Sequence, residues 1–308
     1  MTSRSGRGRW LAVWLGRLVA AVTLGYLGYL TVEGSRRIVS PGRRPFLPAE
    51  GEPGTPADLG IAFEDVRFTT DDGVTLSGWL IPAARETHAA VVLMHGYSWN
   101  RLPWLAGFVP WLHRRYNVLQ FDFRGHGGSG DALITLGTLE QRDVTAAVRF
   151  LAGRGLGPIA LMGVSMGGSV AIMAAPDLPV AAVVADAAYA DLRNPISNRM
   201  REAGYPLSVL GSRLVVGAAS LRARARLRSP IQRVAQIAPR ALLLIAPSGD
   251  RTVSPAQSQR MFEAAGEPKE LYIVEGAAHA DAHAAAPEAY ERRVLDFLAR
   301  HLDGVPPV

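Results

Sequence analysis

The chain has 308 residues, 48% of them hydrophobic, which is enough to bury one large core of about 250 residues. It contains no cysteine, so a disulfide, a thiolate nucleophile and a cysteine-ligated metal are all excluded. The formal net charge of +6 is unevenly distributed: residues 1–44 hold eight arginines against one acidic residue, residues 190–230 hold eight against two, and the rest of the chain is acidic.

The first predicted element is an apolar segment, residues 10–32, in which Arg17 is the only charge. As a helix rising ~1.5 Å per residue it would be about 34 Å long, enough to cross a bilayer. We therefore interpret it as a single-pass membrane anchor, with basic flanks that suit anionic lipid head groups. A cleavable signal peptide is one alternative, although no Ala-x-Ala site follows, and a buried helix of a soluble domain is another. The alternative interpretation of the arginines is that they reflect an arginine-rich composition and have no specific partner.

The arginines on the two flanks of this segment nearly tie in number. We expect the N-terminus in the cytoplasm and the catalytic domain outside it. The sequence thus predicts a basic flank and anchor helix over 1–35, a tether rich in proline and glycine over 36–60, and one large domain over 61–303.

The large domain opens with a predicted hairpin around Asp71-Asp72-Gly73, after which buried-strand patterns alternate with helical ones. Two helices have the sequence of a capping box at their start, Thr138 with Gln141 and Ser254 with Gln257. This alternation predicts a mostly parallel, eight-stranded α/β sheet with helices on both faces. The predicted strands are 63–70, 74–81, 89–94, 117–123, 158–163, 180–186, 241–246 and 271–275, and the predicted helices are 102–114, 138–153, 166–175, 255–265 and 287–301.

Ser165 is the candidate nucleophile. It lies in Gly163-Val164-Ser165-Met166-Gly167, directly after an apolar strand and directly before a helix. Small residues on both sides permit a sharp strand-to-helix turn that presents the hydroxyl above the sheet edge. Glycine is abundant in this chain, so it is the strand-turn-helix context, more than the five residues, that indicates a function.

A serine hydroxyl near neutral pH needs a base to accept its proton and an acid to orient that base. Asp250 and His279 follow the seventh and eighth predicted strands, and the carboxyl ends of parallel strands meet at one edge of the sheet. We predict Ser165 as nucleophile, His279 as base and Asp250 as acid. Asp186 and His283 are the alternative acid and base.

The order serine, aspartate, histidine is that of the α/β-hydrolase superfamily, which the chain resembles over about 63–302. It looks most similar to membrane-anchored serine hydrolases with one N-terminal helix and a short cap. The motifs that carry this resemblance are LMHGY at 93–97, FDFRGHGGSG at 121–130, the Ser165 motif, GDRTVSP at 249–255 and GAAH at 276–279.

The resemblance implies an oxyanion hole formed by the backbone N–H groups of Met166 and Tyr97. It also implies structural roles for His95 and His126, and a cap inserted at about 190–229. The cap holds two apolar stretches, 205–210 and 214–221, followed by four arginines. Two interpretations of this cap are open. It is either a small helical hairpin that shields the active site or a basic lip that docks on lipid.

Other chemistries fit the sequence less well. The Gly125-x-Gly127-x-x-Gly130 pattern opens no helix that could hold a dinucleotide, and the segment from His279 to His283 lacks a third metal ligand. We expect neither cofactor nor metal, no nucleic-acid partner, and a small or lipid-like ester as substrate. The predicted activity is hydrolysis of carboxylic esters or thioesters through an acyl-enzyme. A peptidase of the same fold and a catalytically silent membrane-tethered scaffold are the alternatives.

Overall fold

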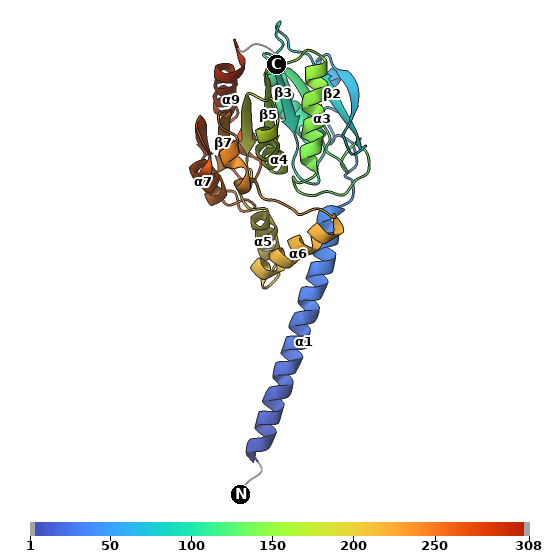
Figure 1. Cartoon of the computed structure of the whole chain (residues 1–308), viewed down its shortest axis with the longest axis vertical. Helices are drawn as coiled ribbons and strands as arrows, with labels where there is room; N and C mark the ends of the chain where they lie inside the picture. The colour runs from blue at the N-terminus through green and yellow to red at the C-terminus, as the bar shows by residue number, and fades with distance from the viewer. Residues whose placement is uncertain (1–3, 305–308) are drawn as a thin grey trace.

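A long N-terminal helix projects from an α/β domain in the computed structural model, which describes residues 4–304 (Figure 1). This helix, α1, runs from Arg4 to Val39. The first three residues of the predicted basic flank lie outside the described residues. The exposed side chains of α1 include Trp14, Leu18 and Leu24. The helix leaves the domain at the end where α5 (Arg193–Glu202) and α6 (Ser208–Arg222) lie.

The domain is built on an eight-stranded sheet of order β1-β2-β4-β3-β5-β6-β7-β8. The pairs β1/β2 and β2/β4 are antiparallel, whereas β3 to β8 run parallel to one another. The predicted eight-stranded, mostly parallel sheet is therefore confirmed. The strands are β1 Glu64–Thr69, β2 Thr75–Ile81, β3 Ala90–Met94, β4 Asn117–Phe121, β5 Ile159–Val164, β6 Ala182–Asp186, β7 Ala241–Pro247 and β8 Lys269–Val274.

Helices cover both faces of this sheet, which explains why strands such as β3 and β5 are buried along their whole length. Successive residues of a strand point to opposite faces, so Leu161 joins one hydrophobic cluster while Ala160 and Met162 join the other. The first cluster includes side chains of α3, α4 and α7, and the second includes those of α2 and α9. These helices are α2 Leu105–Leu112, α3 Glu140–Gly153, α4 Met166–Ala174, α7 Pro255–Ala264 and α9 Pro287–Leu302, with the short α8 at Ala282–Ala285.

Neither predicted capping box forms. Helix α3 begins at Glu140, whose carboxylate accepts hydrogen bonds from the backbone of Thr135 and Gly137, both at 2.7 Å. Helix α7 does begin after Ser254, but the serine side chain makes no capping bond. The Gln257 side chain instead accepts the N–H of Asp191 at 2.9 Å, because this tertiary partner lies within its reach. Both predictions were wrong, for different reasons: at α3 the carboxylate of Glu140 takes the local hydrogen bonds, whereas at α7 a contact distant in sequence takes the Gln257 side chain.

The segment predicted as a tether is irregular after Val39 except for a 3-10 turn at Pro56–Leu59, and it packs on the domain. The guanidinium of Arg43 lies 2.7 Å from the Asp131 carboxylate, and that of Arg44 lies 3.7 Å from the centre of the Trp99 ring. The ring of Phe46 meets Trp79 edge-on. The four residues 36–39 continue helix α1 instead of starting the tether. The end of α1 is consequently attached to the domain rather than loosely linked to it.

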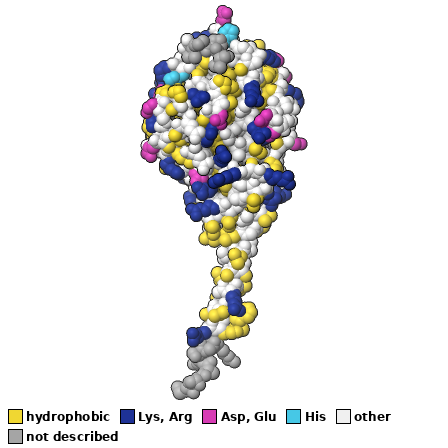
Figure 2. Space-filling view, in the orientation of Figure 1, with side chains coloured by type: hydrophobic (Ala, Val, Ile, Leu, Met, Phe, Trp, Pro, Cys, Tyr) yellow, Lys and Arg dark blue, Asp and Glu magenta, His cyan; other side chains and the backbone are white. Residues whose placement is uncertain are grey.

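The cap consists of α5 and α6, and its tip is apolar and exposed. The turn between the two helices and the start of α6 expose Tyr205, Leu207 and Val209 to 42%, 50% and 54%. The predicted stretch 205–210 is therefore a turn and a helix start, because Leu207 has a left-handed backbone. In Figure 2 hydrophobic side chains gather below a belt of arginine side chains, at the junction of the domain and α1. The exposed cap arginines are Arg193, Arg199, Arg201, Arg213, Arg222, Arg224, Arg226 and Arg228.

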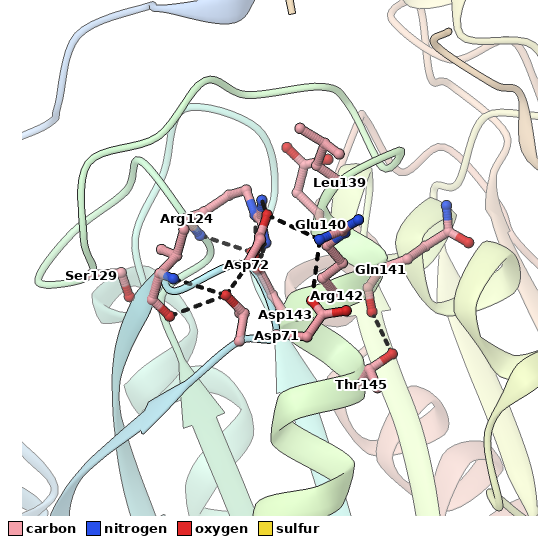
Figure 3. Close-up of polar contacts among 12 residues, drawn as sticks. Asp71, Asp72, Arg124, Ser129, Leu139, Glu140, Gln141, Arg142, Asp143 and Thr145 are labelled. Atoms are coloured by element: carbon pink, nitrogen blue, oxygen red, sulfur yellow. Dashed lines mark hydrogen bonds and ion pairs between the residues drawn. The ribbon is translucent and has the colours of Figure 1, made fainter. Parts of the chain in front are cut away.

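Arg124 joins three parts of the domain beside the sheet (Figure 3). From the loop after β4, its guanidinium bonds Asp72 of the β1–β2 turn at 2.8 and 3.0 Å. Its Nε donates to Asp143 of α3 at 2.8 Å, and its backbone N–H donates to the same carboxylate at 2.9 Å. The guanidinium lowers the pKa of Asp72 to about 2, chiefly by hydrogen bonding. The motif FDFRGHGGSG thus fixes the hairpin and α3 against the sheet.

Candidate active site

Ser165 lies at a sharp turn between β5 and α4. Its backbone has φ 55° and ψ −113°, a conformation that non-glycine residues rarely adopt. The turn needs small neighbours: a Cβ added to Gly163 would overlap the backbone of Gly167, and one added to Gly167 would overlap the carbonyl oxygen of Met94. The serine hydroxyl is thereby held above the carboxyl edge of the sheet, at the N-terminus of a helix.

A continuous hydrogen-bond chain runs from Ser165 through His279 to Asp250. The Ser165 Oγ lies 2.9 Å from His279 Nε2, and His279 Nδ1 lies 2.6 Å from Asp250 Oδ2. The second carboxylate oxygen of Asp250 accepts the N–H groups of Thr252 and Val253 at 2.8 and 2.7 Å. The Asp250 side chain is 1% exposed and that of His279 is 17% exposed. An imidazole whose Nδ1–H donates to a buried carboxylate leaves Nε2 free to accept the serine proton.

Hydrogen bonds between two loops bring Asp250 and His279 together. The loop after β7 carries Asp250, and the loop after β8 carries His279. Gly249 N–H donates to the carbonyl of Ala277 at 2.9 Å, and Gly276 N–H donates to the Ser248 hydroxyl at 2.8 Å. Since β7 and β8 are neighbouring parallel strands, their carboxyl ends place both loops at the same edge of the sheet.

Residues 91–293 match the family model described as the alpha/beta hydrolase family. This chain belongs to the α/β-hydrolase family. An uncharacterized protein of Mycobacterium tuberculosis is 30% identical over 294 residues, 92% of either chain, and the protein YfhR of Escherichia coli K12 is 27% identical over 78% of this chain and 82% of its own. The structure of the Pyrococcus furiosus esterase Pf2001 superposes with a TM-score of 0.70 at 30% identity, over 80% of this chain and 94% of that one.

In this α/β hydrolase, two backbone N–H groups beside Ser165 are suited to bind an oxyanion. Met166 is the first residue of α4, where N–H groups lack partners within the helix and the helix dipole favours negative charge. The loop that carries Tyr97 is close by, since a Cβ added to Gly96 would lie 3.6 Å from the Ser165 Cβ. Among the described residues, no hydrogen-bond acceptor is found for the N–H of Met166 or of Tyr97.

Two buried histidines hold the loop before Tyr97 and the loop after β4 together. His95 Nε2 accepts the N–H of Phe123 at 3.0 Å, and His126 Nε2 accepts the N–H of Ser98 at 3.2 Å. Burial lowers the pKa of both imidazoles, so both are neutral near pH 7 and can accept these bonds.

The alternative acid and base lie elsewhere. Asp186 is buried at the end of β6 and accepts the hydroxyl of Tyr290 at 3.0 Å, and its pKa is raised to about 7 by burial. His283 Nε2 lies 3.1 Å from Glu291, and its ring stacks on Trp111. Neither side chain has a hydrogen bond to Ser165 or His279 within the described part of the chain.

No group of three or more His, Asp or Glu side chains among residues 9–304 is arranged to hold a metal ion. The glycine-rich loop after β4 leads to no helix before Glu140, and its Gly130 N–H pairs with the carbonyl of Thr75 at 2.7 Å. That loop is therefore attached to β2, beside the strand pair β2/β4.

A cavity of about 440 Å³ opens above Ser165 and His279, and the cap forms part of its wall. Helix α1 forms another part, which sequence analysis did not foresee because the anchor was treated as separate from the domain. Leu30, Gly34 and Ile38 line the cavity at spacings of four residues, one face of a helix. The spacing of four residues can be seen in the sequence and indicates one face of a helix. Hydropathy alone, however, does not distinguish a face that lines a cavity from one that faces lipid.

Proposed function

We propose that this protein is a membrane-associated serine hydrolase that cleaves carboxylic esters or thioesters through an acyl-enzyme on Ser165. The observation that carries the proposal is the chain of hydrogen bonds from Ser165 Oγ through His279 to Asp250, at 2.9 and 2.6 Å. The esterase assignment of the Pyrococcus furiosus relative favours an ester over an amide as the bond cleaved.

In the proposed reaction, His279 Nε2 accepts the Ser165 proton as Oγ attacks the acyl carbonyl carbon. The N–H groups of Met166 and Tyr97 stabilise the resulting oxyanion, and each such donor typically contributes a factor of about 10²–10³ in rate. The imidazolium then donates its proton to the departing alkoxide or thiolate. A water molecule that gives its proton to His279 then attacks the acyl carbon; the bond between that carbon and Ser165 Oγ breaks, the imidazolium returns the proton to Oγ, and the carboxylic acid leaves. Asp250 keeps the ring in the required tautomer and stabilises its charged form.

Membrane association is supported by α1. Its segment from Arg9 to Val39 has a mean hydropathy of 1.6 in its most apolar window, and none of that window is buried. A continuous exposed surface of leucines, valines and tryptophans along about five turns of a helix is unfavourable in water, whereas a bilayer accommodates it. A signal sequence has the same length and apolar composition, so these two properties alone do not separate it from an anchor.

Fluorophosphonate labelling of the full-length protein tests the nucleophile. The wild type is expected to be labelled and to hydrolyse p-nitrophenyl acetate, while Ser165→Ala is neither labelled nor active. Ser40→Ala, at an exposed serine without a side-chain hydrogen bond among the described residues, is the matched control and should behave as wild type. A folded wild type that stays unlabelled would favour a silent scaffold, and preferential cleavage of anilides over esters would favour a peptidase.

Fractionation tests the membrane part of the proposal. The intact chain should stay with membranes through an alkaline carbonate wash and be released by detergent. Recovery of a soluble product shortened at its N-terminus, as measured by mass spectrometry, would instead identify a cleaved signal peptide.

A further inference from the structure

The wall that α1 contributes to the cavity above Ser165 suggests a second role for this helix. The cavity is lined by six residues of α1, namely Tyr29, Leu30, Glu33, Gly34, Arg37 and Ile38. They recur every three or four positions and so form one face of the helix. Ser165 and His279 line the same cavity, which means that a substrate in reach of the nucleophile also lies against α1.

Specific contacts hold α1 in this position. The Tyr97 hydroxyl donates to the backbone carbonyls of Arg37 and Ile38 at 2.9 and 3.1 Å, which joins the end of α1 to the residue whose N–H we assign to the oxyanion hole. At the cap, Arg222 Nε donates to the Ser35 hydroxyl at 2.8 Å. Two turns further from the domain, the Tyr26 hydroxyl donates to the carbonyl of Pro206 at 2.9 Å.

The helix leads from the reaction centre towards the exposed apolar stretch. Ile38, next to Tyr97, and Tyr29 are nine positions apart, or ~14 Å along the helix at a rise of ~1.5 Å per residue. This is far longer than an acetyl group. Ile196, Met200 and Val215 of the cap also line the cavity, and Val215 packs directly against Gly34 of α1, so the lining around α1 is predominantly apolar.

The charged side chains in the cavity lining are Glu33, Arg37 and Arg199. Glu33 accepts hydrogen bonds from Arg36 and Arg37 at 3.1 and 2.7 Å, so its carboxylate is compensated within α1. Beyond the cavity, Leu207 and Val209 of the cap tip are exposed, and the hydrogen bond between Tyr26 and Pro206 places this tip against α1. Figure 2 shows hydrophobic side chains gathered below the arginine belt. Apolar surface below a cationic belt matches the acyl and headgroup layers of a bilayer.

We propose that α1 is part of the substrate site: Leu30 and Gly34 form the wall against which a long acyl chain lies, and the substrate is a long-chain acyl ester taken from the bilayer that holds α1. This inference rests on the proposed function, because it places the acyl carbonyl at Ser165. It makes Leu30 a specificity-determining residue and the N-terminal helix more than an anchor.

The test compares Leu30→Trp with Val32→Trp in the full-length protein, reconstituted in phosphatidylcholine vesicles. Leu30 is 7% exposed and lines the cavity, whereas Val32, on the same helix, is 57% exposed. The measured quantity is kcat/KM for p-nitrophenyl palmitate relative to p-nitrophenyl acetate. Leu30→Trp should lower this ratio at least tenfold, since the indole fills the space of the chain, and Val32→Trp should leave it within twofold of wild type. Equal ratios in the two variants overturn the inference.

Fluorophosphonate labelling separates this inference from the proposed function. A wild type that is labelled at Ser165, with a palmitate-to-acetate ratio that Leu30→Trp does not change, leaves the serine hydrolase standing and removes α1 from the site. If Leu30→Trp fails to fold, Leu30→Ala gives the test: it should lower the ratio at least threefold through lost contact with the chain. An unchanged ratio there also overturns the inference.

A second measurement addresses the source of the substrate. A long-chain ester confined to the vesicles that contain the protein should be hydrolysed at least tenfold faster than the same ester in separate vesicles. Equal rates would mean that the substrate arrives through water and would contradict the proposed route.

Discussion

Gly34 of α1 lies so close to Val215 of α6 that a Cβ on Gly34 would stand 2.8 Å from the Val215 Cγ2. The absence of a side chain at this position therefore allows the N-terminal helix to pack closely against the cap. Both residues also line the cavity above Ser165, so the contact between these two helices forms part of the cavity wall.

Gly34→Ala should weaken this packing. The new methyl group must displace Val215, and we expect the midpoint of thermal unfolding in detergent to fall by about 2–4 °C, as for a loss of about 1 kcal/mol in a domain of this size. Gly28→Ala is the control, since a Cβ there meets nothing within 4 Å and alanine favours the helix. A higher midpoint for both variants would show that Gly34 is not a packing constraint.

Asp250→Asn should lower kcat for p-nitrophenyl acetate by about 10⁴-fold while the fold is retained. An amide in place of the carboxylate, 2.6 Å from His279 Nδ1, favours the wrong tautomer of the ring and does not stabilise its charged form. Asp186→Asn is the matched variant at the alternative acid, and its kcat should stay within tenfold of wild type. The reverse pattern would assign the role of the acid to Asp186.

Asp186 should make stability fall as pH rises from about 4 to 7. Its pKa is raised to about 7 in the folded chain, so across this range the folded state keeps a proton that the unfolded state has released. The cost grows with pH to about 4 kcal/mol above pH 7. Asp186→Asn should therefore raise the unfolding midpoint more at pH 7.5 than at pH 5, and an equal gain at both pH values would contradict this assignment.

Arg124→Met should destabilise the fold by about 3–5 kcal/mol, because it leaves the buried carboxylate of Asp143 without its ion pair. The combination with Asp143→Asn should cost less than the sum of the two single substitutions, since the second removes the uncompensated charge. Calorimetry of all three variants in detergent provides the comparison. Additive losses would mean that the two side chains do not act as a pair.

Much of the architecture follows from short stretches of sequence. The alternation of apolar runs with helical patterns predicts the sheet and its helices, because each element forms from the periodicity of its own residues. The turn at Ser165 is equally local: glycines at 163 and 167 are needed within five residues of the serine. The predicted boundaries differ from the observed ones by at most three residues, the largest difference being at the start of α2, predicted at 102 and observed at Leu105.

Other features depend on contacts between residues far apart in the chain. The motif around Asp250 favours it over Asp186, but the meeting of its carboxylate with His279 depends on the hydrogen bond between its loop and Ala277. The position of α1 also depends on contacts with residues far away in the sequence. As a sequence it is an apolar helix that lipid or protein could cover equally well, and its Leu30 face becomes a cavity wall only because Tyr97 and the cap bind its last turns. Local periodicity determines which elements form, whereas the choice among equivalent surfaces and side chains requires the whole fold.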